Sequence, residues 1–316
     1  MARTAGVSTA SASRALTRPE LVSDALRERV LYAASALGYA ANSAARALSA
    51  RRSGLVGAVV GGLADPVTAE ILRAAEARLS AGGIGLLISV ASRQAAAEAC
   101  ARALSARGVD GLLFIGCGAV PEPAHWGPGR ALPSVNAGQQ SSAGAMPAAR
   151  GMAWERGLDL VQAYLRQIGH RRIGVVTGSW EEGGNRQALP HGESTSIEQR
   201  VDQLHDTDAV RAAVALLLQT EVTAIVAASD AAAAAALREC RARNRAVPQH
   251  VSIVGWGDTG LARCLSPTLT SARVPTHQTG EAAAECLLAA IAGTEYSWPD
   301  LPVKLVIRES SGPAPG

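Results

Sequence analysis

Two kinds of hydrophobic pattern alternate along most of this chain. From residue 55 onward, short apolar runs of four to six residues are separated by longer stretches in which apolar residues recur at helical spacing. The apolar runs predict strands at 55–60, 85–90, 111–115, 173–177, 224–227 and 251–254. The longer stretches predict helices at 67–81, 93–106, 155–168, 208–219 and 230–244. Strands that alternate with helices in this way predict a mostly parallel sheet covered by helices.

The alternation breaks near the middle of the chain. Residues 121–149 are rich in Pro, Gly, Ser and Gln and follow neither period. We therefore predict two doubly wound sheets side by side, with a cleft between them in which a ligand can bind.

A different pattern fills the first 50 residues, which predict short helices only. Ser8 is placed to cap a helix over residues 9–16, and Val7 is placed to pack against its first turn. Pro19 ends this helix, because a proline cannot continue one. The chain thus begins with a small all-α head.

Two further helices are predicted in the same region. One begins after Ser23, which serves as its cap, and ends at Gly38. The other covers residues 42–49, with Asn42 as its cap. A helix of two turns is unstable alone, so this last one needs a partner.

Charge separates the same two regions. Residues 1–53 contain eight arginines against three acidic residues, a net charge of +5, whereas the remainder has 22 basic and 24 acidic residues. A basic head on a slightly acidic body is typical of nucleic-acid binding.

The head also contains the pieces of a helix-turn-helix. Gly6 permits a tight turn before the helix that Ser8 begins. The positions expected to face a major groove are Ser8, Thr9, Ala10, Ser13 and Arg14. Arg14 can donate two hydrogen bonds to a guanine or hold a phosphate. The alternative is an ordinary surface helix with an exposed arginine.

Ordered motifs extend this interpretation along the whole chain. The head carries Ala5-Gly-Val-Ser8, Ser13-Arg14, Val22-Ser23, Arg27-Glu-Arg-Val30, Leu37-Gly-Tyr39 and Asn42 followed by Ala45-Arg46-Ala-Leu48. The body carries, among others, Val109-Asp-Gly-Leu112, Ala224-Ile-Val-Ala-Ala-Ser-Asp230 and Leu265-Ser-Pro-Thr-Leu-Thr270. In this order the motifs resemble the lactose-repressor (LacI/GalR) family of bacterial transcription regulators.

The resemblance implies an α/β protein with a small all-α helix-turn-helix head. The head would occupy residues 1–41, and a hinge helix and linker would occupy 42–53. The body, 54–316, would be periplasmic-binding-protein-like, with two doubly wound parallel-sheet subdomains and crossovers near 150, 260 and 275–300. We therefore expect a ligand-responsive transcriptional repressor, a cytoplasmic homodimer that binds double-stranded operator DNA and needs no cofactor.

In this family the hinge folds into a helix on DNA, and a leucine from each subunit wedges into the minor groove. The matching leucine is Leu48, and the other hinge positions expected to contact DNA are Asn42, Ala45 and Arg46. The alternative for Leu48 is packing against its own head.

The resemblance also implies a small, sugar-like effector held between the subdomains. The expected effector-binding residues are Asp65, Thr68, Arg186, Asp230 and Trp256. Charged groups at strand ends suit a polyhydroxylated ligand, because they form directional hydrogen bonds. Asp65 and Asp230 have an alternative role as helix caps, and Arg186 is aligned loosely. If Asp230 is a ligand acceptor, its removal should leave the fold intact.

The chain departs from the family in two places. Val67 and Thr68 stand where an aromatic residue is common, which leaves Trp180 and Trp256 as candidates for stacking on a ligand. The stretch 180–206 is polar, aperiodic and shorter than the usual helix–strand unit, so it does not predict a complete second sheet.

Other classes of protein have little support in the sequence. The G-x-G-x-x-G match at 255–260 follows a strand, but too short a helix follows for a dinucleotide site. The six histidines have no metal-binding spacing, and the five cysteines are scattered and odd in number. No apolar run is long enough to span a membrane. We therefore expect neither an enzyme nor a metal site.

The competing class is a solute-binding or sensor protein with a degraded DNA-binding head. Only four residues precede Ala5, where the family has a full helix, so we expect either a start upstream of Met1 or a degraded head. The basic head favours the regulator, since a solute binder has no use for it.

Overall fold

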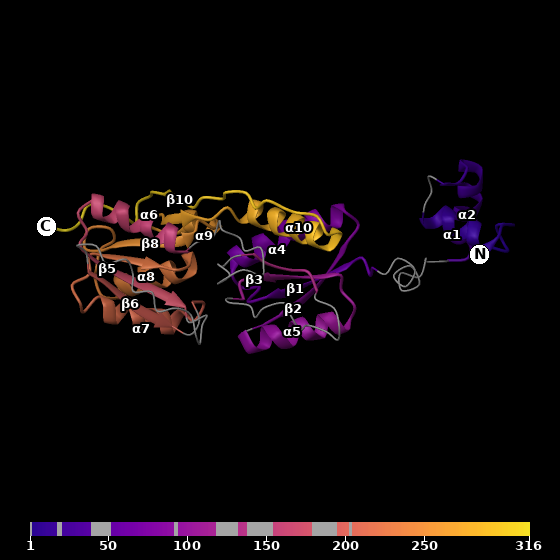
Figure 1. The fold of residues 1–316 in the computed structure, drawn as a ribbon. Helices are drawn as coiled ribbons and strands as arrows, with labels where there is room; N and C mark the ends of the chain where they lie inside the picture. The colour runs from indigo at the N-terminus through magenta and orange to yellow at the C-terminus, as the bar shows by residue number, and fades with distance from the viewer. Residues whose placement is uncertain are drawn as a thin grey trace. The chain divides into compact units, whose positions relative to one another are not determined.

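In a computed structural model of the chain, the described part of the head contains two helices. They are α1 (Thr9–Thr17) and α2 (Asp24–Ala36) (Figure 1). The two helices pack through small buried side chains. By its internal contacts the chain divides into two units, Met1–Ser53 and Gly54–Gly316. The structure describes residues 2–17, 21–38, 52–91, 94–117, 132–137, 154–178, 195–201 and 204–316.

Within the described residues, the first sheet of the body has four parallel strands in the order β2-β1-β3-β4. The strands are β1 (Leu55–Val60), β2 (Gly85–Val90), β3 (Gly111–Ile115) and β4 (Ser134–Ala137). Two helices cover one face of this sheet and one helix covers the other face. Each face has its own hydrophobic cluster under its helices. The pair is α4 (Pro66–Ala81) and α10 (Thr276–Ala292), and the single helix is α5 (Gln94–Ala106).

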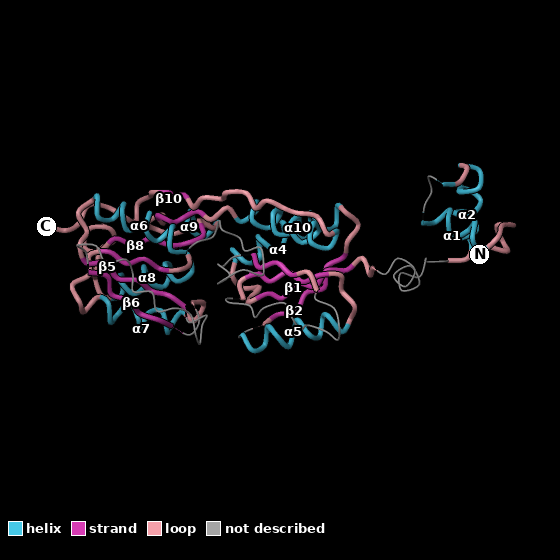
Figure 2. The backbone as a smooth tube through the Cα atoms, viewed as in Figure 1, coloured by secondary structure: helices cyan, strands magenta, loops and turns pink. Residues whose placement is uncertain are grey.

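The second sheet has six strands in the order β10-β9-β8-β7-β5-β6, and only β10 runs antiparallel to its neighbour. Its strands are β5 (Arg172–Gly178), β6 (Thr195–Val201), β7 (Ala224–Ala227), β8 (Ser252–Gly257), β9 (Thr270–Arg273) and β10 (Lys304–Val306). Its helices are α6 (Trp154–Gln167), α7 (Thr207–Leu217), α8 (Asp230–Ala242) and the short α9 (Gly260–Cys264). Helices α7 and α8 cover one face and α6 the other (Figure 2). The predicted fold class is confirmed.

The chain passes between the two sheets more than once. Helix α10 follows strand β9 of the second sheet, yet it packs beside α4 on the first sheet, after which β10 joins the second. The chain therefore crosses between β4 and α6, between β9 and α10, and between α10 and β10. Residue 260, near which a crossover was expected, instead begins α9, which packs on α8.

Four strands lie where the sequence predicted none: β4, β6, β9 and β10. Strand β4 falls within the irregular stretch 121–149, and β6 falls within the polar stretch 180–206. Within the described residues, β4, β6 and β10 each pair at one side only and so lie at the edges of their sheets there. Edge strands need not be apolar on both faces, which is why hydrophobic pattern alone did not find them.

Gly280 allows α10 to lie close to the backbone of α4. A Cβ at this position would collide with the Ile71 carbonyl oxygen and lie 2.7 Å from the Ala74 Cβ. Helix propensity favours alanine over glycine by about 1 kcal/mol, but overpacking costs about 1–3 kcal/mol and a backbone atom cannot rotate away. We expect Gly280→Ala to lower the free energy of unfolding by about 1–2 kcal/mol in urea denaturation.

Gly260→Ala is the matched control. Gly260 is also helical and has no neighbour within 4 Å of an added Cβ. This variant should be as stable as the wild type or slightly more so. A Gly280→Ala chain as stable as Gly260→Ala would contradict the close packing of the two helices.

Candidate nucleic-acid interface and effector site

A tight turn leads into α1. Gly6 has φ +63°, the Gly6 N–H donates to the Arg3 carbonyl at 3.2 Å, and the Val7 N–H donates to the Ala2 carbonyl at 3.1 Å. This pair of bonds around a left-handed glycine is the geometry that ends a helical turn. The Ser8 Oγ then accepts from the Ser11 N–H at 3.0 Å, so Ser8 caps α1 as predicted.

Helix α1 has one covered face and one open face. Ala12 and Ala15 are buried against Val30 and Ala33 of α2. The positions predicted to meet DNA lie on the open face and are all exposed: Ser8, Thr9, Ala10, Ser13 and Arg14. The structure thus brings these five side chains to one surface, and their contact with bases stays a prediction.

The rest of the head agrees with the sequence in part. Ser23 stands at the N-cap position of α2, but its side chain forms no capping hydrogen bond, contrary to expectation. Gly38 has φ +57° and follows the end of α2, as predicted. The hinge candidates Asn42, Ala45, Arg46 and Leu48 lie outside the described residues.

In the body, Asp65 and Thr68 lie together at the start of α4, beyond the carboxyl end of β1. One carboxylate oxygen of Asp65 accepts from the Thr68 N–H at 3.0 Å and from the Thr68 hydroxyl at 2.6 Å. Asp65 is therefore the N-cap of α4, the alternative role considered for it. Thr68 is buried, and Gly116 at the end of β3 lies against its hydroxyl.

Asp230 is the first residue of α8 but not its cap. Ser229 is the N-cap, and its Oγ accepts from the Ala232 N–H at 3.0 Å. The Asp230 side chain, on a residue only 2% exposed, instead accepts from the Thr259 N–H at 2.6 Å and the Thr259 hydroxyl at 2.8 Å. Its other oxygen accepts from the Ser271 hydroxyl at 2.6 Å. The helix-cap alternative is wrong, because this carboxylate joins α8 to the ends of β8 and β9.

Asp258, one position from Thr259, was missed in the sequence. Its carboxylate is fully buried and accepts from Arg273 Nε at 2.7 Å and from Arg308 Nη2 at 2.5 Å. The Asp258 N–H donates to the Ser271 hydroxyl at 3.0 Å, so Ser271 connects Asp258 to Asp230. Asp258 directly follows the buried strand β8, and Asp65 and Asp230 lie a few residues after buried strands. This position in the sequence could have identified Asp258 as a candidate site residue. We call Asp230, Asp258, Thr259, Ser271, Arg273 and Arg308 the strand-end cluster.

Trp256 does not face a ligand cleft. It is 7% exposed and belongs to the core between the second sheet and α6, where its ring lies directly over Gly157. The Trp154 ring packs beside it, with centroids 4.5 Å apart. The prediction that Trp256 stacks on an effector is corrected, since β8 turns its side chain into the core. Arg186 and Trp180 lie outside the described residues.

The beginning of α4 lies against the strand-end cluster. A Cβ on Gly257, the last residue of β8, would be 2.8 Å from Val67 Cγ2 and 3.6 Å from Asp230 Oδ2. The Thr276 hydroxyl, at the start of α10, donates to Glu70 of α4 at 2.7 Å. The structure therefore brings the predicted residues Asp65, Thr68 and Asp230 into one region, at the carboxyl ends of the strands.

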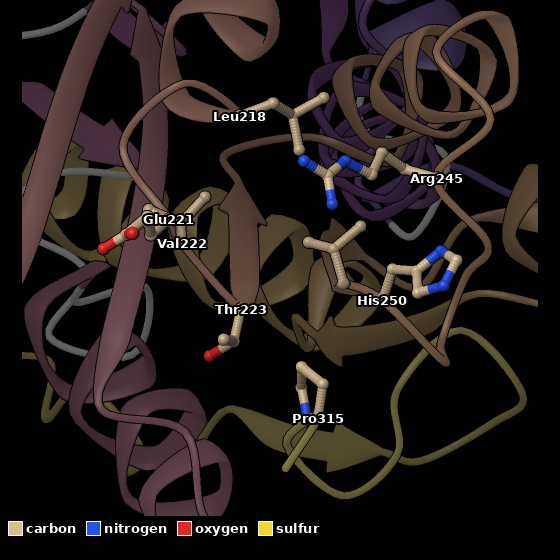
Figure 3. Close-up of a pocket in the computed structure, with 8 residues that line it drawn as sticks. Leu218, Glu221, Val222, Thr223, Arg245, His250 and Pro315 are labelled. Atoms are coloured by element: carbon tan, nitrogen blue, oxygen red, sulfur yellow. The ribbon is translucent and has the colours of Figure 1, made fainter.

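A separate cavity of about 200 Å³ opens at the opposite edge of the second sheet. Figure 3 shows the side chains around it. They come from the amino ends of β7 and β8 and from the C-terminal segment: Leu218, Glu221, Val222, Thr223, Arg245, His250, Val251 and Pro315. Glu221 is held by Arg172 at 2.7 Å. Of the predicted site residues that the structure describes, none lines this cavity.

Residues 1–42 match the family described as bacterial regulatory proteins, lacI family, and residues 162–311 match a periplasmic binding protein-like domain. The fold and these two family matches define the class of this protein, a regulator with a helix-turn-helix head and a periplasmic-binding-protein-like body. The HTH-type transcriptional regulator CelR of Thermobifida fusca is 31% identical over 339 residues, which cover 98% of this chain and 96% of that protein. The chain belongs to the LacI family.

Other similar proteins are also regulators. The ribose operon repressor of Haemophilus influenzae is 28% identical, over 98% of this chain and 97% of that protein. Among solved structures, the lac repressor dimer bound to operator and the anti-inducer ONPF has a TM-score of 0.81 at 23% identity, covering 98% of this chain and 97% of that one. A CelR–cellobiose complex has a TM-score of 0.62 at 26% identity, covering 98% of both chains. In the described part of this chain, no helix is long and apolar enough to cross a membrane.

Burial raises the pKa of the Asp230 carboxyl above its usual 3.8, although the hydrogen bonds from Ser271 and Thr259 act in the opposite direction. A carboxyl whose pKa is higher in the folded state binds its proton more tightly there. Its contribution to stability is therefore present at low pH and lost as the pH rises through the folded pKa. We expect the stability of the wild type, measured against Asp230→Asn in urea, to fall as the pH rises above about 4.

Asp230→Ala completes this test. It leaves the buried donors of Thr259 and Ser271 without an acceptor, which should make it less stable than Asp230→Asn by about 1–3 kcal/mol at every pH, because neither variant titrates at this position. The hydrogen bonds of Asp230 thus predict a loss of stability where the sequence alone predicted none. A constant difference between wild type and Asp230→Asn from pH 4 to pH 7 would contradict the raised pKa.

Proposed function

We propose that this chain represses transcription as a cytoplasmic homodimer, and that a sugar or a similar small polar metabolite controls its binding to operator DNA. Its membership of the LacI family makes it a DNA-binding regulator. The single observation that carries the proposal is the open face of α1, on which five small or basic side chains stand clear of the head's core. A recognition helix needs such a face to enter a major groove.

Arg14 is the side chain on this face with the greatest capacity for base recognition. A guanidinium can donate two parallel hydrogen bonds to the O6 and N7 atoms of a guanine. Thr9 and Ala10 are exposed at the first turn of α1, where side chains of a recognition helix reach base edges. We assign base contacts to these three residues and backbone contacts to Ser8 and Ser13.

We assign the effector to the region between α4 and the strand-end cluster. Two similar proteins are associated with sugars: one is named the ribose operon repressor, and the other is the regulator CelR in a complex with cellobiose. Carboxylates and hydroxyls gather there, and these groups suit a polyhydroxylated ligand. Asp230 already accepts three hydrogen bonds of the roughly four that a carboxylate can take, so its main role is to position Thr259 and Ser271.

Ligand and DNA binding are coupled through the chain crossings. Arg273 is the last residue before the crossing into α10, and Arg308 follows β10 after the chain has returned. Both arginines bind the same Asp258 carboxylate. A ligand that closes the two sheets on each other changes the geometry of these crossings, and two states of the body then favour or disfavour DNA binding. A solute-binding protein without DNA is the weaker alternative, because residues 1–42 match the LacI head.

Arg14→Ala should weaken binding to a site selected from random DNA by about 1–3 kcal/mol and relax preference at one base pair. Arg14→Lys is the control, because lysine keeps the charge but cannot form the paired bonds. If Arg14 reads a guanine, both variants lose specificity in a gel-shift titration at fixed salt. A lysine variant with wild-type affinity and specificity would show that Arg14 only holds a phosphate.

A panel of pentoses, hexoses, disaccharides and sugar acids tests the effector. A sugar present at 100 times its dissociation constant stabilises the folded body by about 2.7 kcal/mol, which raises the melting temperature by several degrees. We expect at least one member to do so in a thermal-shift assay and to change operator affinity. If every member leaves both quantities unchanged, while purines or amino acids alter them, the sugar assignment is wrong.

A further inference from the structure

We propose that Arg29 is a positioning residue of the DNA-binding head, which fixes the direction in which α1 leaves the turn before it. The proposal rests on the role in base reading proposed above for α1. Arg29 lies near the middle of α2, and its Nη2 atom donates to the Ala5 carbonyl at 3.0 Å and to the Gly6 carbonyl at 3.4 Å. One guanidinium thus connects the second helix to two successive residues of the turn.

The turn has acceptors that its own backbone does not use. Within the described residues, its backbone hydrogen bonds run from Gly6 to Arg3 and from Val7 to Ala2. The carbonyls of Ala5 and Gly6 accept neither of these bonds. Carbonyl groups at the end of a helical turn lack intrahelical partners, and basic side chains commonly satisfy them. Arg29 has this role here, but it comes from a different helix.

Hydrophobic packing between α1 and α2 relies mainly on small side chains. The buried ones are four alanines and one valine, Ala5, Ala12, Ala15, Val30 and Ala33, and the partly buried Ala2, Val7, Leu16 and Val22 pack against them. Each alanine contributes a single methyl group, so the two surfaces interdigitate little and gain few contacts that depend on orientation. A directional contact such as that of Arg29 therefore has a larger share in fixing the geometry.

The contact lies close to the residues that meet DNA. Gly6 is two residues before Ser8, the cap of α1, and Thr9 and Ala10 follow immediately. A shift of the turn therefore moves the first turn of α1. Binding groups must be held within about 0.5 Å of their productive positions to form directional hydrogen bonds. Loss of the Arg29 contact should thus reduce recognition of the correct bases.

A direct phosphate contact would give Arg29 a different signature. A phosphate contact contributes to binding of every sequence, and its loss lowers the slope of log affinity against log salt by about one. A positioning contact contributes only where base contacts are made. The two roles are therefore separated by comparing a selected site with random DNA.

The experiment uses the full 316-residue chain, a duplex site selected by the wild type from a random library, and a duplex of random sequence. Arg29→Ala is compared with Arg27→Ala, which removes the same charge from an exposed position of the same helix. We expect Arg29→Ala to bind the selected site roughly tenfold more weakly than Arg27→Ala does. On random DNA the two variants should have equal affinities and equal salt slopes. Arg29→Lys should recover part of the loss, because an ammonium group can donate to one of the carbonyls.

Two results would overturn the proposal. One is an equal loss for Arg29→Ala and Arg27→Ala on the selected site. The other is a loss for Arg29→Ala as large on random DNA as on the selected site, because Arg29 would then hold a phosphate or the fold of the head. If the wild type enriches no sequence at all, base reading by α1 is refuted and the role of Arg29 falls with it.

Discussion

Two buried carboxylates hold the carboxyl edge of the second sheet together. A buried carboxylate is costly unless donors surround it, and Asp230 and Asp258 obtain all of theirs from neighbouring elements. Ser271 serves both, since its hydroxyl donates to Asp230 and accepts from the Asp258 N–H. The ends of β8 and β9, the start of α8 and the segment after β10 are therefore fixed relative to one another by a single network.

This network also determines how the two sheets are joined. Arg273 ends β9 immediately before the chain crosses to α10, which packs on α4 of the first sheet. Arg308 lies beyond β10, after the chain has crossed back. Asp258 binds both arginines. The crossing from β9 to α10 therefore starts beside this buried carboxylate, and the crossing from α10 to β10 ends near it.

Much of the fold could be predicted because its inner strands are apolar on both faces. The runs at β1, β3 and β7 were predicted at the bounds observed, since a strand covered by helices on both sides leaves no polar positions. The edge strand β6 (Thr195–Val201) has polar residues within it and becomes recognisable only through its pairing with β5. Pairing is a long-range property, and a local hydrophobic pattern does not contain it.

The candidate site was predictable in its location but not in the role of each residue. An aspartate after a buried strand indicates the carboxyl edge of a sheet, and Asp65 and Asp230 both lie there in the structure. Whether such a group caps a helix or binds neighbouring elements depends on partners far away in sequence, such as Ser271 for Asp230. The same limit explains Trp256: its side chain faces α6 because of how β8 is paired and covered, and the sequence does not fix which face that is.

The proposed role of α1 is to read DNA bases from the major groove. Methylation interference tests this role directly, because dimethyl sulfate modifies guanine N7 in the major groove and adenine N3 in the minor groove. We expect N7 methylation to block binding of the full chain at guanines in two symmetric half-sites, with centres about one helical turn, or 34–36 Å, apart. Binding that is insensitive to N7 methylation, or blocked only by adenine N3 methylation, would contradict it.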